Sequence, residues 1–122
     1  MAIKKQEFYE GAALYLLART GAITSIRYDA PFLLLNDRLF VLLKYSTKGR
    51  SPWRFTFTPD EQEVLHRRAT QCKIIIGLIC GADGVAAFTY DAYVRVAALR
   101  KSSVHIACYR QHHKHYEAGL SS

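Results

Sequence analysis

The sequence of 122 residues predicts a single α/β domain, with a mixed β-sheet flanked by helices. Segments of helical periodicity alternate with short apolar segments of strand length, which is typical of this class. Half of the residues are hydrophobic and 12% are aromatic, so the chain can bury a core without disulfides or metal ions. No repeat, low-complexity run or linker divides it. We therefore expect one domain over residues 1–122, ending in a polar segment from about residue 109 to 122.

The first predicted element is a helix over residues 4–20. This segment contains no proline and is rich in alanine and leucine, and Gly21 after it can take the left-handed conformation that ends many helices. Its apolar residues recur at helical spacing, so we expect them to pack on a sheet. The stripe consists of Phe8, Ala12, Tyr15 and Leu16, widened by Ala13, Leu14 and Leu17.

Three extended segments follow this helix. Residues 22–27 predict a first strand, and residues 31–35 and 38–45 predict a hairpin. The turn between the hairpin strands is Asn36-Asp37, and both residue types tolerate the positive φ that a tight hairpin turn requires. Because both strands are almost entirely apolar, we expect both of their faces to be covered.

The strongest local signal is a helix start at Thr58. Residues 53–57 alternate in polarity with period two and predict a short strand that leads directly into this helix. Thr58 can cap the helix, Pro59 suits its first position and Glu61 completes a capping box. The predicted helix runs to about Gln71.

The remaining elements alternate between strand and helix. Residues 73–80 and 85–90 predict strands joined by a glycine-containing turn, residues 92–99 a short helix capped by Asp91, and residues 104–108 a last strand. The predicted order is α-β-β-β-(β)-α-β-β-α-β.

Cysteine usage and hydropathy favour a cytoplasmic protein. Cys72, Cys80 and Cys108 lie in or beside apolar segments, which suits reduced, buried thiols better than a disulfide framework. No apolar run approaches the roughly 20 residues that span a bilayer, and the N-terminus lacks the apolar region of a signal peptide. We therefore expect no membrane partner.

The element order resembles the restriction-endonuclease-like fold of the PD-(D/E)xK superfamily. In both, a helix precedes three strands, a lysine stands at the end of the third strand, and a helix and a strand follow (α-β-β-β-α-β). Residues 44–57, a lysine strand followed by a polar loop and Trp-x-Phe, are similar to the stretch after the catalytic strand in several members. Members include Holliday-junction resolvases and intron-encoded homing endonucleases. The resemblance covers most of residues 4–79.

The resemblance implies a metal site that this sequence lacks. The family places one carboxylate on the second strand and another two residues before the lysine, and together they hold a divalent cation. Lys44 matches the lysine, but the two carboxylate positions fall on Leu42 and on Phe32 or Leu33. Hard cations need oxygen ligands, so we expect a catalytically inactive nuclease-like domain without a cofactor.

The alternative is a metal-dependent nuclease whose carboxylates have moved to other positions. Migrated carboxylates occur in the superfamily, and Glu10 and Asp29 could converge with Lys44 around Mg²⁺ or Mn²⁺. The sequence thus leaves open whether the chain is an enzyme.

The loop after Lys44 is the candidate nucleic-acid site. A formal net charge of +7 favours a polyanionic partner, with DNA expected ahead of RNA. Basic side chains would contact phosphates and one aromatic side chain would stack on a base or wall the groove. The competing interpretation is a solvated surface loop with the tryptophan buried under the following helix. The candidate residues are Arg38, Lys44, Lys48, Arg50, Trp53 and Arg54.

The apolar richness of the chain supports a third hypothesis. A small domain with 50% hydrophobic residues has apolar surface to spare, which a second subunit or a partner strand could cover. A homodimer or another protein-interaction module is therefore a further expectation.

Overall fold

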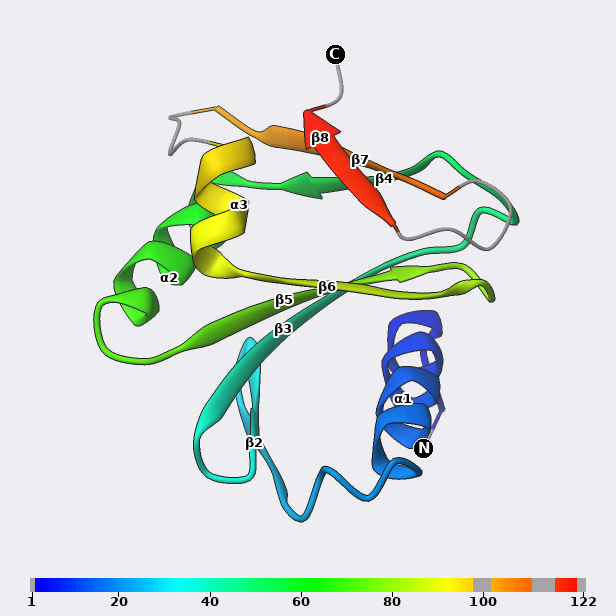
Figure 1. Cartoon of the computed structure of the whole chain (residues 1–122), viewed down its shortest axis with the longest axis vertical. Helices are drawn as coiled ribbons and strands as arrows, with labels where there is room; N and C mark the ends of the chain where they lie inside the picture. The colour runs from blue at the N-terminus through cyan, green and yellow to red at the C-terminus, as the bar shows by residue number, and fades with distance from the viewer. Residues whose placement is uncertain (1, 98–101, 111–115, 121–122) are drawn as a thin grey trace.

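The computed structural model describes residues 2–97, 102–110 and 116–120. Within them the chain is mixed α/β, with a five-stranded mixed sheet, a three-stranded sheet and three helices. The five-stranded sheet lies in the middle, with the three-stranded sheet on one side and helix α1 on the other (Figure 1). The predicted α/β class is confirmed. The expectation of one sheet was wrong, because the strand at residues 53–57 pairs with the C-terminal strands instead of joining the hairpin.

The five-stranded sheet has the order β1-β2-β3-β5-β6. Strands β3 and β5 pair in parallel, and the other neighbours pair antiparallel. A parallel pair needs a long crossover, which β4 and α2 provide here. The bounds are β1 (Ile26–Asp29), β2 (Phe32–Leu35), β3 (Leu39–Ser46), β5 (Ile74–Cys80) and β6 (Gly84–Thr89).

The turn residue Asn36 explains why the first strand begins later than predicted. Asn36 and Asp37 both have positive φ, as expected for the hairpin turn. The Asn36 side chain also accepts a hydrogen bond from the backbone nitrogen of Thr24 at 2.7 Å and donates one to the carbonyl oxygen of Ala22 at 2.8 Å. These bonds hold residues 22–25 against the turn, so the strand starts at Ile26 and not at Ala22.

The three-stranded sheet is antiparallel, in the order β4-β7-β8. Its strands are β4 (Trp53–Phe57), β7 (Val104–Tyr109) and β8 (Glu117–Leu120). Strand β8 lies within the C-terminal segment expected to be polar, where no strand was predicted. Residues 111–115 of that segment lie outside the described part of the chain. Burial alternates along β4, with Trp53, Phe55 and Phe57 buried.

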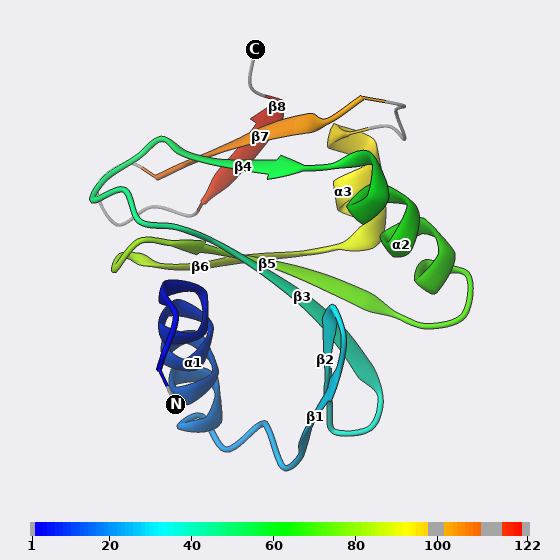
Figure 2. The ribbon, with the colours of Figure 1, turned by 180° about the vertical axis from the view of Figure 1, so that it is seen from behind.

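The two faces of the five-stranded sheet bury different cores. The larger core lies between the two sheets and contains the three aromatic residues of β4. Helices α2 (Pro59–Ala69) and α3 (Tyr90–Val96) lie together at one end of this space (Figures 1 and 2). Helix α2 starts as predicted, with the hydroxyl of Thr58 accepting a hydrogen bond from the Glu61 nitrogen. Helix α3 starts two residues before the predicted position, with Thr89 as its cap in place of Asp91.

Helix α1 (Lys5–Ala18) packs on the other face of the sheet in an orientation that the sequence did not predict. Its contacting residues are buried Ala13 and half-buried Tyr9 and Leu14. The Tyr9 ring stacks on Tyr45 of β3, with ring centroids 5.5 Å apart, and this contact turns the opposite side of the helix outward. The centre of the predicted stripe, at Phe8, Ala12 and Tyr15, therefore faces away from the sheet, whereas Ala13 and Leu14 at its edge contact the sheet. None of the described helices has both the length and the apolar character needed to cross a bilayer.

Candidate nucleic-acid interface

Lys44 lies inside the structure and not on an open face. Its Nζ atom donates hydrogen bonds to the carbonyl oxygen of Thr56 and to Oε2 of Glu61, the latter at 2.7 Å. The same ammonium group lies 4.7 Å from the centroid of the Phe57 ring. Only 17% of the Lys44 side chain is exposed. The structure therefore does not favour the expected contact of Lys44 with phosphates, because its charge is already compensated within the fold.

The positions where the resemblance requires carboxylates carry apolar side chains that are buried or half-buried. Phe32 is fully buried and Leu42 is 5% exposed, and both pack in the cluster that contains Leu65 of α2. Leu33, the alternative to Phe32, is half-buried in the other core, on the α1 side of the sheet. Leu42 and Lys44 share one face of β3 because side chains alternate along a strand. Along this face of β3 the neighbours of Lys44 are apolar Leu42 and polar Ser46, and the carboxylate of Glu61 approaches from α2.

The three residues of the migrated-carboxylate alternative do not come together. Asp29 accepts a hydrogen bond from Arg68 at 2.9 Å, whereas Lys44 binds Glu61. Arg68 and Glu61 are seven residues apart on α2, about 10 Å along the helix axis. Glu10 lies on the α1 side of the sheet, beside Val41 and Leu43, opposite the face that carries Lys44.

The electrostatics of the two glutamates differ accordingly. Burial, with repulsion from Glu7, raises the pKa of Glu10 above its ordinary value. Burial also acts to raise the pKa of Glu61, but the hydrogen bonds from Lys44 and Thr58 outweigh it and leave the pKa lowered. Glu61 is thus an ionised partner of Lys44. Among the described residues, no group of three or more His, Cys, Asp or Glu side chains is arranged to hold a metal ion.

Trp53 lies in the core and contacts the backbone of the cationic loop, which we define as residues 47–52 between β3 and β4. The indole is 2% exposed, so it cannot stack on a base, and the competing interpretation of a buried tryptophan is confirmed. It packs edge-on against Tyr116 in place of the predicted helix, with ring centroids 6.1 Å apart. Its Nε1 atom donates a hydrogen bond to the Lys48 carbonyl oxygen at 2.8 Å.

Gly81, in the turn between β5 and β6, contacts the same loop. A Cβ atom at Gly81 would lie 2.3 Å from the Lys48 carbonyl oxygen, and the residue has a φ of +55°. Its backbone nitrogen also donates to the carbonyl oxygen of Ser46 at 2.8 Å. The turn and the tryptophan thus both contact the backbone where the loop begins.

The exposed cations of this loop are Lys48 and Arg50. Neither forms a salt bridge within the part of the chain that the structure describes. Arg54 is exposed on the outer face of β4, just beyond the loop. Arg38 precedes β3 and Lys48 follows it, so these residues lie beyond opposite ends of an eight-residue strand that is about 26 Å long. The structure therefore brings Lys48, Arg50 and Arg54 to one region and leaves Arg38 out.

Comparison with known proteins identifies no relative of this chain. No family model, curated protein or solved structure matches this chain. The function must be argued from the molecule itself.

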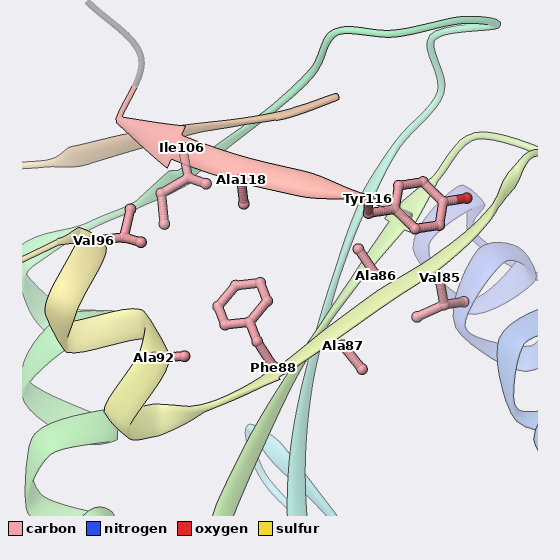
Figure 3. Close-up of a pocket in the computed structure, with 9 residues that line it drawn as sticks. All are labelled: Val85, Ala86, Ala87, Phe88, Ala92, Val96, Ile106, Tyr116 and Ala118. Atoms are coloured by element: carbon pink, nitrogen blue, oxygen red, sulfur yellow. The ribbon is translucent and has the colours of Figure 1, made fainter. Parts of the chain in front are cut away.

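A pocket of about 410 Å³ opens between β6, α3 and β8 (Figure 3). The lining side chains among the described residues are apolar apart from Tyr116, whose hydroxyl donates a hydrogen bond to Asp83. These side chains offer mainly apolar contact to a ligand. The pocket is lined by Val85, Ala86, Ala87, Phe88, Ala92, Val96, Ile106, Tyr116 and Ala118.

The sequence did not identify two residues that shape this region. Glu61 was predicted only as a helix cap, although it also neutralises Lys44. Gly81 was predicted only as part of a hairpin turn, although it contacts the cationic loop. Both contacts join segments that lie far apart in the sequence, and no local pattern signals them.

Proposed function

We propose that the chain is a nucleic-acid-binding domain of nuclease-like architecture that does not cleave its ligand. In support, the chain has α1, the meander β1-β2-β3, helix α2 and strand β5 parallel to β3, which is the α-β-β-β-α-β order that the resemblance implies with β4 inserted before α2. The observation that carries the proposal is the loop after β3, which presents Lys48 and Arg50 without acidic partners in the described chain. Such a loop suits phosphate contacts, which are independent of sequence.

The lack of catalysis follows from the surroundings of Lys44. A divalent ion beside this lysine would meet Phe32 and Leu42, which have no oxygen ligands to offer. The one carboxylate there, Glu61, is committed to the lysine and to the helix cap. The metal-dependent nuclease is therefore the less favoured function.

The proposal predicts that Lys48→Ala with Arg50→Ala weakens binding to labelled DNA. Each phosphate contact on duplex DNA contributes about 0.9 to the slope of log K against log salt concentration. We expect the double substitution to lower that slope by about 1.8, measured by fluorescence anisotropy at several salt concentrations. RNA of the same length tests the expected preference for DNA.

The matched control is Arg38→Ala with Lys73→Ala. It removes the same two charges from the other end of β3 and β5, where both residues are exposed. If both double variants lost the same amount of DNA affinity, only net charge would matter, and the proposal that this loop is the binding site would be contradicted. Plasmid cleavage in Mg²⁺ or Mn²⁺ that Asp29→Ala abolishes would instead support the nuclease.

A further inference from the structure

The outer side of α1 carries an apolar stripe that is largely exposed, although the Arg19 guanidinium lies 5.7 Å from the centroid of the Tyr15 ring. Phe8 is 70% exposed, Tyr15 is 65% exposed and Leu16 is 53% exposed. Ile3, just before the helix, is also largely exposed. Monomeric proteins rarely leave large side chains of this kind together on one helix face.

Gly11 lies midway along this stripe, at its border with the cavity between α1 and the five-stranded sheet. Glycine inside a helix costs about 1 kcal/mol relative to alanine. A Cβ atom at Gly11 would meet nothing within 4 Å, so no contact inside the described chain requires glycine. Glycine would be required at this position if the backbone of another helix approached closely from outside, as happens where helices pack through small residues.

The stripe is symmetric about this small residue. Phe8 and Tyr15 are seven residues apart, so they lie almost on one line along the helix and about 10 Å from each other. The midpoint between them falls at Gly11 and Ala12, both exposed. With a two-fold axis through that midpoint, Phe8 of one copy meets Tyr15 of the other, and the reverse contact forms at the same time. A different protein would not need this symmetry.

The two exposed rings supply part of the area that a dimer of standard size buries. With about 200 Å² for a whole aromatic side chain, the exposed parts of Phe8 and Tyr15 amount to roughly 270 Å² per copy. This is about a third of the roughly 800 Å² that each partner contributes to an interface of standard size. Ile3, Leu16 and the small residues between the rings add to it.

We propose that two copies of the chain associate through α1, packed antiparallel about a two-fold axis at Gly11 and Ala12. Phe8 and Tyr15 of each copy form the aromatic contacts on either side of the axis. The inference does not depend on nucleic-acid binding, and each proposal can fail without the other.

Sedimentation velocity over a range of protein concentrations tests the dimer. We expect the unsubstituted chain to sediment as a dimer and the variant Phe8→Ser with Tyr15→Ser to sediment as a monomer with unchanged circular dichroism, because both side chains are exposed. Tyr109→Ser is the matched control, since Tyr109 is 46% exposed on β7 of the other sheet and should leave the dimer intact.

Gly11→Ala separates a role at the interface from a role within one chain. Inside the monomer, alanine should favour the helix and raise the Tm of the Phe8→Ser, Tyr15→Ser background by about 3–5 °C. In the otherwise unsubstituted chain it should weaken the dimer about tenfold, because the added methyl group separates the two helices.

Cysteine cross-linking tests the orientation, in a Cys72→Ser background. Ala12→Cys lies beside the axis and should form a disulfide-linked dimer on oxidation, whereas Phe8→Cys should not. Linking of both variants would indicate parallel helices and overturn the antiparallel arrangement. A monomer at every soluble concentration, or a dimer that persists without Phe8 and Tyr15, would overturn the proposal itself.

Discussion

At the scale of single residues, Lys44 shows how a partner decides the role of a charged side chain. Its place at the end of an apolar strand suits a catalytic lysine or a phosphate ligand. In the structure Glu61 of α2, 17 positions further along the chain, pairs with Lys44, and their two charges neutralise each other beside the Phe57 ring. The net charge of the chain is thus not shared evenly among its basic residues, because some of them, like Lys44, stabilise the fold.

We predict that this ion pair stabilises the fold in a pH-dependent way. The pKa of Glu61 in the folded chain lies below its ordinary value of 4.5. Its contribution is therefore fully present above pH 4.5 and is lost as the pH falls through the folded-state pKa. Glu61→Gln should lower the free energy of unfolding at pH 7 and make no difference at a pH below that pKa.

Urea denaturation at several pH values measures this effect. Lys44→Met, which leaves Glu61 without its cation, should cost about 1–3 kcal/mol at pH 7. The control is Glu63→Gln, which breaks the exposed pair with Arg67 on the same helix and should change stability by less than about 0.5 kcal/mol. Similar pH profiles for Glu61→Gln and Glu63→Gln would contradict the assignment.

Part of this site was predictable at the residue scale. Period-two alternation places Trp53 on the same face as Phe55 and Phe57, so the burial of the tryptophan follows from the strand pattern itself. The apolar character of Phe32 and Leu42, and with it the missing oxygen ligands, was also evident. The pairing of Asp29 with Arg68 was not, because nothing in either segment specifies which helix lies over which strand.

At the scale of elements, predictions held where the signal is local. The start of α2 depends on Thr58, Pro59 and Glu61, which are close in sequence, and it was predicted at the correct residue. The orientation of α1 was wrong because apolar residues lie on nearly all sides of that helix. Its periodicity could not select the inward face, and the contact between Tyr9 and Tyr45 does so in the structure. Strand β8 was missed because EAGL has no strand-like pattern.

The turn between β5 and β6 gives a prediction at this scale. Gly81→Ala would place a methyl group 2.3 Å from the Lys48 carbonyl oxygen, at a φ that alanine rarely adopts. We expect a loss of roughly 2 kcal/mol or more in the free energy of unfolding, together with weaker DNA binding, because the cationic loop must shift.

The control for this prediction is a glycine in the cationic loop itself. A Cβ atom at Gly49 would meet nothing within 4 Å, so Gly49→Ala should change the free energy of unfolding by less than about 0.5 kcal/mol. If Gly81→Ala is as stable as Gly49→Ala and binds DNA equally well, the turn does not position the loop.

At the scale of the whole molecule, the division into two sheets was not predictable from local patterns. Strand β4 pairs with β7, and the paired residues Thr56 and His105 are 49 positions apart. Period two marks β4 as a strand but does not select its neighbour, so the sequence could not distinguish one sheet from two. The resulting arrangement places α1 on the face of the central sheet opposite the three-stranded sheet (Figure 2).

The two proposals make a joint prediction for the whole molecule. Lys48 and Arg50 follow β3, whereas the proposed dimer contact lies on the outer side of α1, so a dimer would present two cationic loops. A duplex long enough to reach both loops would then release about twice as many counterions as one that reaches a single loop.

On a duplex of about 40 base pairs, the slope of log K against log salt concentration should therefore be about twice as steep for the unsubstituted chain as for Phe8→Ser with Tyr15→Ser. On a duplex of about 10 base pairs the two slopes should agree, and because serine replaces uncharged residues, net charge cannot cause a difference. Equal slopes on the long duplex, with a dimer shown by sedimentation, would mean that the two loops do not act on one nucleic acid.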